Sequence, residues 1–297
     1  MGALMKFVET SDSSKAFLAL DLDGTALLED HGKVFISSSV EKGVKAVHDL
    51  KIPVVLNTLR FPLSVMTTVG EAWYQIADIP IPTVLLNGSV LGYIKRDGDR
   101  LVYEEVAAQP MSPGEVKAIV DGIIQLRNDG IDDVLCFFYS RNWEEGETLW
   151  TAKGARVAAL KKKYISAARV ISGSVEELAQ ELSRREICMA SILIDRPADT
   201  LMAYQHSKRT SFVTAKGVNK ASGIKVMARR LGLDSIDALG AGDTEMDTFL
   251  SEVGFAVIVG GAKLSFRGRK GTTRVDTPMQ LGDLILTYAE LLKRKGA

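Results

Sequence analysis

Cysteine and histidine are scarce in this chain, and neither forms a pattern that suggests a reactive or metal-binding site. The two cysteines, Cys136 and Cys188, stand in apolar surroundings without a Cys-x-x-Cys spacing. This indicates buried thiols and argues against a disulfide framework or a zinc site. His31, His48 and His206 are scattered without ligand spacing, so we expect surface or helix positions for them.

Net charge and long apolar segments are also lacking. The 37 basic residues balance 37 acidic ones, which gives no electrostatic argument for binding nucleic acid or an anionic membrane. No segment has the length of a membrane span. The first twenty residues carry Glu9 and Asp12 without a long apolar core, so no signal peptide is expected. We therefore predict a soluble cytoplasmic protein with no nucleic-acid or membrane partner; the sequence carries no signal for an oligomeric state.

What the chain does contain is a buried-strand pattern that ends in two carboxylates. Residues 16–25 read AFLALDLDGT, an apolar run that stops at Asp21 and Asp23 and continues with Gly24. Such a run suits a strand buried on both faces, and glycine allows a sharp turn after it. Open α/β sheets bind ligands at this end of their strands. Because two acids this close repel each other, the spacing predicts a metal, a role in proton transfer, or both.

The segments on either side of the middle of the chain alternate between strands and helices. Apolar runs at 54–56 and 83–86 predict two more strands, with helices at about 38–50 and 63–77. This order predicts a parallel sheet with right-handed crossovers. From residue 216 onward the alternation resumes, with predicted helices at 220–231, 243–250 and from about 277, and predicted strands at 235–239 and 255–259.

The middle of the chain has a different pattern. A β-hairpin is expected over residues 90–105, and capping boxes at Ser112 and Ser174 predict two helix starts. Strands are expected at 134–139, 169–172, 192–195 and 210–214, and a short helix at 155–163. We predict two domains: an α/β core of residues 1–88 and 215–297, and an inserted α+β domain of residues 89–214.

Polar side chains follow four of the predicted strands: Asp21 and Asp23, Asn57 and Thr58, Asn87, and Asp243. The carboxyl ends of parallel strands share one edge of a sheet, so these side chains should converge there. Lys220, at the start of a helix just after the insertion, is placed to join them. Carboxylates, a lysine, a hydroxyl and glycine-rich backbone suit metal-assisted phosphoryl transfer. Mg²⁺ is the expected metal because its ligands are commonly a few carboxylates together with substrate phosphate oxygens.

These residues resemble the haloacid dehalogenase (HAD) superfamily of phosphatases, and the resemblance covers both flanking segments. Asp21-Leu22-Asp23-Gly24-Thr25 matches its first motif, Thr58 its second, Lys220 its third and Gly242-Asp243-x-x-x-Asp247 its fourth. An insertion before the third motif resembles the Cof-type branch (HAD-IIB-like), which carries a large cap there. The resemblance implies a Rossmann-like parallel-sheet core with an inserted α+β cap.

The resemblance also implies a role for each matched residue. Asp21 is the nucleophile that forms an aspartyl-phosphate, and Asp23 protonates the leaving alkoxide and then deprotonates water. Thr58 binds the phosphoryl oxygens, and Lys220 holds Asp21 and the phosphate. The implied Mg²⁺ site consists of the Asp21 carboxylate, the Asp23 backbone carbonyl and Asp243, with Asp247 in an outer or water-mediated place.

Four further residues carry less specific signals. For Arg60 and Asn87, substrate contact and turn structure stand as equal alternatives. Met246 occupies a place where many relatives have asparagine, and Leu59 replaces a frequent glycine. Met246 puts in question the outer hydrogen bonds that would support a bound metal. Leu59 puts in question how closely a substrate approaches the chain beside Thr58.

The predicted function is magnesium-dependent hydrolysis of a small phosphorylated metabolite, with a sugar phosphate expected. Two alternatives remain open: a sugar phosphomutase of the same superfamily, and a non-catalytic binding or regulatory protein on this scaffold. A dinucleotide-binding loop at Gly240-Ala241-Gly242 is set aside, because Glu245 stands where its third glycine should fall.

Overall fold

The structure is a computed structural model that describes residues 2–30, 33–194 and 211–296. It contains two compact units. The first comprises Met1–Arg60, Val65–Ala107 and Val218–Ala297, and the second comprises Phe61–Ser64 and Ala108–Gly217. His31, Asp195, His206 and Thr210, which figured in the sequence predictions, lie outside the described residues.

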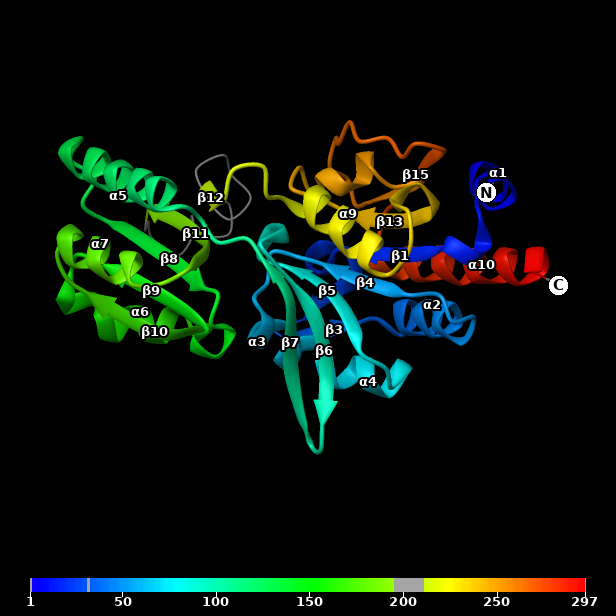
Figure 1. The fold of residues 1–297 in the computed structure, drawn as a ribbon, viewed down its shortest axis with the longest axis horizontal. Coiled ribbons are helices and arrows are strands. Elements are labelled where there is room, and N and C mark those ends of the chain that lie inside the picture. Colours follow the sequence, from blue (N-terminus) through cyan, green and yellow to red (C-terminus); the bar gives the residue numbers. More distant parts are fainter. Residues whose placement is uncertain (1, 31–32, 195–210, 297) are drawn as a thin grey trace. The chain divides into compact units, whose positions relative to one another are not determined.

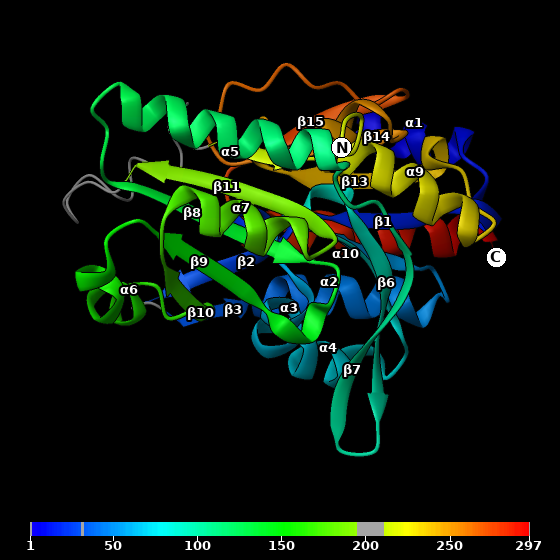
Figure 2. The same ribbon diagram turned by 60° about the vertical axis from the view of Figure 1, so that its left-hand side comes forward.

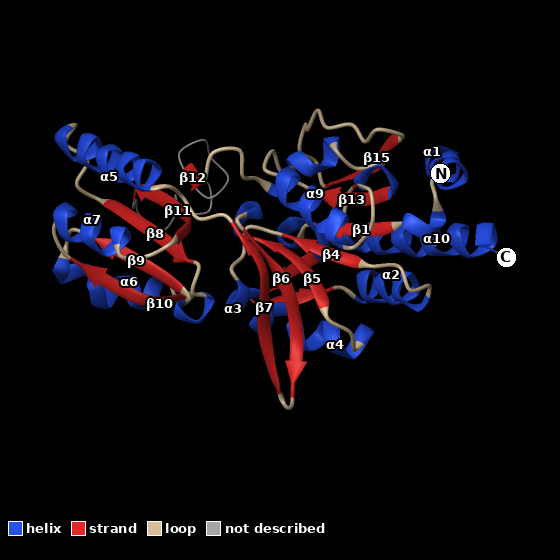
Figure 3. Ribbon diagram, in the orientation of Figure 1, coloured by secondary structure: helices blue, strands red, loops and turns tan. Residues whose placement is uncertain are grey.

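The first unit is built on an eight-stranded sheet with the order β15-β14-β13-β1-β4-β5-β6-β7 (Figures 1 and 3). Its strands are β1 (Phe17–Leu20), β4 (Val54–Asn57), β5 (Ile81–Leu85), β6 (Val90–Asp97), β7 (Arg100–Ala108), β13 (Ala238–Gly242), β14 (Phe255–Val259) and β15 (Gly271–Val275). Neighbouring strands are parallel from β15 to β5, whereas β6 is antiparallel to β5. The predicted parallel-sheet α/β core is therefore confirmed. Every residue of β1, β4, β5 and β14 is buried, as their mainly apolar sequences predict.

Helices cover both faces of this sheet. On one face, Ile224 and Met227 of α9 (Lys220–Arg230) pack in a core that includes Ala256 and Ile258 of β14. On the other face, Phe255 of the same strand packs against Phe7 of α1 (Gly2–Thr10), with the two rings tilted and their centroids 5.3 Å apart. Helices α2 (Ser38–Asp49) and α10 (Pro278–Gly296) lie close together in the same unit, where Gly43 packs closely on α10.

Several segments differ from the sequence predictions. The predicted helix 63–77 is divided into α3 (Pro62–Val65), a π-helical turn (Met66–Gly70) and α4 (Glu71–Ala77). The predicted helix over 243–250 is wrong: only a 3₁₀ turn (Thr248–Ser251) forms there. The periodicity also did not indicate α1, β15, the β9 strand of the second unit, or a hairpin of β2 (Leu27–Asp30) and β3 (Lys33–Ile36) that follows β1.

The β6–β7 hairpin was assigned by the sequence to the insertion that begins at residue 89. In the structure this hairpin extends the sheet of the first unit, because β6 pairs with β5 from Ile81↔Ile94 to Leu85↔Val90. The inserted part of the chain correspondingly leaves the first unit after Ala107. Alternating residues describe a hairpin, but they do not identify the sheet that it joins.

The second unit has a five-stranded sheet with the order β10-β9-β8-β11-β12, seen most openly in Figure 2. Its elements are β8 (Val134–Ser140), β9 (Glu147–Thr151), β10 (Ala167–Ser172), β11 (Ile187–Ile194), β12 (Ser211–Thr214), α5 (Pro113–Asn128), α6 (Val157–Lys163) and α7 (Val175–Ser183). Both predicted capping boxes are present at α5 and α7, which pack on one face of the sheet. Within the described residues, no helix combines the length and apolar character that crossing a membrane requires.

Candidate active site

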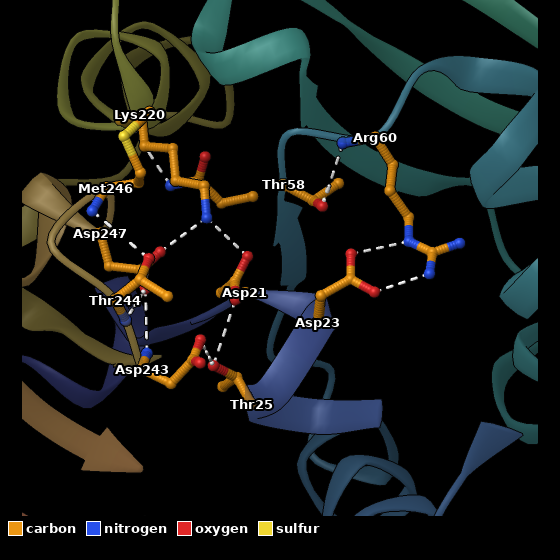
Figure 4. A network of polar contacts seen from close by, with 11 residues as sticks. Asp21, Asp23, Thr25, Thr58, Arg60, Lys220, Asp243, Thr244, Met246 and Asp247 are labelled. Atoms are coloured by element: carbon orange, nitrogen blue, oxygen red, sulfur yellow. Dashed lines mark hydrogen bonds and ion pairs between the residues drawn. The ribbon is translucent and has the colours of Figure 1, made fainter. Parts of the chain in front are cut away.

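The carboxylate of Asp21 lies at the end of β1, where a lysine and a threonine bind its two oxygens (Figure 4). Lys220 Nζ donates to Asp21 Oδ1 at 2.5 Å, and Thr25 Oγ1 lies 3.2 Å from Asp21 Oδ2. The backbone N–H of Asp21 donates to Ala241 O of the neighbouring strand β13. Because Asp21 is only 4% exposed, its carboxylate is held in one orientation inside the protein.

The turn after β1 depends on Gly24. This residue has a φ of +76°, and a Cβ added to it would lie 2.3 Å from Asp243 Oδ2. Glycine therefore permits both the left-handed backbone and the close approach of Asp243 to the turn. Thr25 Oγ1, one residue later, lies 3.0 Å from Asp243 Oδ1. One hydroxyl thus joins the carboxylates of Asp21 and Asp243.

Asp247 connects the lysine to the loop that carries Asp243. Its Oδ1 accepts a hydrogen bond from Lys220 Nζ at 2.6 Å. Its Oδ2 accepts from the backbone N–H groups of Asp243 and Thr244, each at 2.9 Å. Met246 has no side-chain amide, and its backbone N–H donates to Thr244 Oγ1. The loop is therefore held by Asp247 and Thr244 rather than by an amide side chain at position 246.

The charges of this cluster are unbalanced, with three carboxylates around one ammonium. Burial raises the pKa of Asp21 well above its ordinary value against the opposing charge of Lys220, and burial together with Asp247 raises the pKa of Asp243. Burial acts to lower the pKa of Lys220, but the charges of Asp21 and Asp247 outweigh it and raise that pKa. The site therefore has an excess of negative charge that a cation would neutralise.

A divalent metal fits this arrangement. Asp21, Asp243 and Asp247 each present a carboxylate oxygen, and these oxygens lie within 4.8 Å of one another. Oxygen ligands of this kind suit Mg²⁺. Asp247 accepts hydrogen bonds from Lys220 and from two backbone N–H groups, whereas the Thr25 hydroxyl has a single proton for Asp21 and Asp243 together. Asp21 and Asp243 therefore keep more lone pairs for a metal. Asp247 instead holds Lys220 and the loop that carries Asp243 in place.

Asp23 does not share the surroundings of Asp21, although only one residue separates them. Its carboxylate points toward Arg60, whose Nε donates to Asp23 Oδ2 at 2.8 Å and whose Nη2 donates to Oδ1 at 2.6 Å (Figure 4). The Asp23 side chain is 55% exposed. The spacing of the two acids predicted a metal, a role in proton transfer, or both. In the structure each acid also has a cationic side chain beside it, Lys220 for Asp21 and Arg60 for Asp23.

Thr58 and Asn87 lie at the ends of β4 and β5. Thr58 is buried, and its hydroxyl accepts a hydrogen bond from the Arg60 backbone N–H at 3.2 Å, which leaves its proton available to a ligand. Asn87 adopts a left-handed backbone (φ 57°), and its N–H donates to Thr58 O. Asn87 Oδ1 is buried without a hydrogen-bond partner among the described residues. The backbone of Asn87 therefore forms part of the turn, and its unpartnered side-chain oxygen keeps the substrate-contact alternative open.

The structure thus brings Asp21, Lys220, Asp243 and Asp247 into one hydrogen-bonded cluster, joined to a second pair, Asp23 and Arg60, through the turn at Gly24. Sequence reasoning gave no role to Thr25, which bridges two carboxylates, or to Thr244. The sequence signal for Thr25 was its position at the end of residues 16–25, four residues after Asp21. Asn57, noted only at a strand end, donates its amide to the carbonyl of Lys220 and so fixes the start of α9.

Known proteins resemble this chain in sequence family and in fold. A family model described as haloacid dehalogenase-like hydrolase matches residues 18–266. No curated protein matches the chain significantly. The solved structure of the HAD subclass IIB sugar phosphatase BT4131 is 19% identical, covering 95% of this chain and 99% of its own, with a TM-score of 0.63.

Two further solved structures are similar. The phosphatase BT1666 from Bacteroides thetaiotaomicron is 19% identical, with 95% of each chain covered and a TM-score of 0.63. A haloacid dehalogenase-like hydrolase from B. subtilis is 17% identical, with 94% of this chain and 99% of its own covered and a TM-score of 0.64. At such identities the likeness establishes a common fold, so what the chain does must be argued from its own site.

Proposed function

The chain belongs to the haloacid dehalogenase-like hydrolases, and on that premise we propose that it hydrolyses a small phosphomonoester in a Mg²⁺-dependent reaction through an aspartyl-phosphate. One observation carries the proposal: the Asp21 carboxylate is buried and oriented by Lys220 and Thr25 beside Asp243. A carboxylate needs such orientation to attack phosphorus, and a buried lysine offsets the negative charge of the incoming group.

In the first half-reaction a bond forms between an Asp21 oxygen and phosphorus while the bond from phosphorus to the leaving oxygen breaks. Asp23 gives its proton to that oxygen, which leaves as an alcohol. In the second half-reaction water attacks the same phosphorus, and its proton passes to Asp23. The bond from phosphorus to Asp21 then breaks, which releases phosphate and restores both acids.

The remaining residues bind and orient. Lys220 holds Asp21 and offers positive charge to the phosphoryl oxygens, and the Thr58 hydroxyl donates to one of them. Asp21 and Asp243, with the Asp23 backbone carbonyl, would hold Mg²⁺, which when bound would supply positive charge to the transferring phosphoryl group. Asp247 fixes the positions of Lys220 and the Asp243 loop relative to each other through its hydrogen bonds to both.

We propose that the second unit serves as a cap that selects the substrate and excludes water from the reaction. The chain passes between the units next to site residues, directly after Arg60 and at Gly217–Val218, just before Lys220. Small phosphorylated metabolites, and sugar phosphates among them, are the proposed substrates, in keeping with the sugar phosphatase BT4131.

A panel of phosphorylated metabolites assayed with and without EDTA tests this function. We expect release of inorganic phosphate from at least one sugar phosphate, and loss of that release when EDTA removes the metal. If the panel gives an isomerised sugar phosphate without free phosphate, the phosphomutase alternative is correct. If no substrate is turned over in the presence of Mg²⁺, the chain is a binding protein.

A further inference from the structure

The proposed function does not explain the bidentate ion pair between Arg60 and Asp23. Nε and Nη2 of one guanidinium engage both carboxylate oxygens, at 2.8 and 2.6 Å. The third guanidinium nitrogen, Nη1, donates to Thr68 Oγ1 at 2.9 Å. Thr68 belongs to the π-helical turn Met66–Gly70, a feature that is frequent at functional sites.

The backbone of Arg60 is anchored as firmly as its side chain. Its N–H donates to Thr58 Oγ1, and its carbonyl accepts from the N–H of Leu86 at 3.2 Å. Leu86 reaches that carbonyl from a left-handed conformation with a φ of 50°, which is uncommon for a branched residue. Such conformations persist only where the surroundings enforce them. The Arg60 guanidinium is therefore a fixed support rather than a freely moving surface side chain.

Asp23, by contrast, needs a support. Its side chain is 55% exposed, against 19% for Arg60, and it lies within the turn Leu22–Ala26, where its backbone angles are not helical. An aspartate in that position samples several rotamers in water. Proton transfer to a leaving oxygen requires one of them, and fixing it beforehand removes an entropic cost from the reaction.

We propose that Arg60 is a positioning residue for Asp23: it holds the acid–base carboxylate in one rotamer, and one of its two hydrogen bonds opens to free the oxygen that carries the proton. This inference rests on the proposed function and deepens it. It differs from the reading in which Arg60 contacts the substrate phosphate, because the partner of the guanidinium is Asp23. Planar two-point recognition of this kind is specific to arginine, and lysine cannot reproduce it.

The choice of leaving group separates the two roles. An alkoxide leaves only with a proton from Asp23, whereas 4-nitrophenolate leaves without one. We expect Arg60→Ala to lower kcat/KM for the best sugar phosphate about 30-fold and for 4-nitrophenyl phosphate less than about 3-fold. Arg60→Lys should show the same pattern, and Thr68→Val a weaker form of it. Arg96→Ala is the matched control, because it removes another arginine–carboxylate pair of the same unit, with Glu71.

Three results would overturn the proposal. The first is an equal loss for both substrates carried by KM, with weaker inhibition by inorganic phosphate, which marks a substrate contact. The second is a further leaving-group effect of Arg60→Ala in the Asp23→Asn background, where positioning has nothing left to act on. The third is a crystal structure of Arg60→Ala in which Asp23 keeps a single, unchanged rotamer. That structure tests the inference even if no phosphatase activity is found, an outcome that would refute the proposed function separately.

Discussion

Lys220 Nζ lies 2.6 Å from Asp247 Oδ1, and both side chains are withdrawn from solvent, at 2% and 0% exposure. The other oxygen of Asp247 binds two backbone N–H groups of the Asp243 loop. A single buried carboxylate thus fixes the lysine of α9 to the loop after β13. The positions of two groups that flank Asp21 depend on this one residue.

Replacing Asp247 tests that dependence. Asp247→Ala leaves buried donors without an acceptor, so we expect the free energy of unfolding to fall by about 3 kcal/mol. Asp247→Asn keeps an acceptor oxygen and should lose less. Urea denaturation measures both variants. A loss below about 1 kcal/mol for Asp247→Ala would show that the contacts with Lys220 and the Asp243 loop add little net stability.

The turn at Gly24 gives a second prediction. In Gly24→Ala the left-handed backbone and the approach of Asp243 both oppose the new methyl group, so we expect a loss of about 1–3 kcal/mol and of most activity. Gly98 is a matched control, with a φ of +60° and no atom within 4 Å of an added Cβ. Gly98→Ala should cost about 1 kcal/mol from backbone strain and keep full activity. Equal activity losses in the two variants would contradict the role assigned to Gly24.

Metal binding can be measured without turnover. If Asp21 and Asp243 hold Mg²⁺, the metal stabilises the folded protein by about 2.7 kcal/mol at one hundred times its Kd. Thermal unfolding should therefore shift upward as MgCl₂ is added to the wild type, and the shift should be lost in Asp243→Asn. A shift of the same size in both proteins would remove Asp243 from the metal site.

Much of the fold could be predicted because several of its central strands are mainly apolar. β1, β4, β5 and β14 are mainly apolar, and the polar residues at the ends of β1, β4, β5 and β13 share one edge because these strands are parallel. β15 (Gly271–Val275), with its sequence GTTRV, is an edge strand of half-buried residues and gives no apolar run. The helix expected after Asp243 does not form: Asp247 accepts the N–H groups of Asp243 and Thr244 within a loop, and only the 3₁₀ turn Thr248–Ser251 follows.

Within the site, the sequence predicted which residues lie at the strand ends but not how their side chains pair. Lys220 and Asp21 meet because a helix start and a strand end are brought together by the fold. The pairing of Asp23 with Arg60 depends on side-chain rotamers and on the backbone of Leu86, which no spacing in the chain expresses. The position of the Thr25 hydroxyl between the carboxylates of Asp21 and Asp243 likewise cannot be read from the spacing of residues in the chain.

A pH effect is expected from Glu147 in the second unit. Its carboxylate is buried, accepts hydrogen bonds from Tyr139 and from Ser166 (3.0 Å for the latter), and burial raises its pKa despite those bonds. The folded protein therefore holds this proton more tightly than the unfolded chain does. The free energy of unfolding should fall as the pH rises from the ordinary glutamate pKa through the raised one, by at most about 1.4 kcal/mol per pH unit.

Glu147→Gln removes this titrating group and should make the unfolding free energy less dependent on pH over that range. Urea midpoints measured at several pH values for the variant and the wild type give the comparison. Parallel curves for the two proteins would mean that Glu147 holds its proton equally well in the folded and unfolded states.

Asp21 is the residue on which the proposed reaction depends, and its replacement by asparagine is the most direct measurement. Asn fills the same space but cannot form a phosphoryl-enzyme bond through a carboxylate. With Mg²⁺ and the best substrate of the panel, we predict that Asp21→Asn releases phosphate at least about 10³-fold more slowly than the wild type while remaining folded. Phosphate release at a rate near that of the wild type would contradict the assignment of Asp21 as the nucleophile.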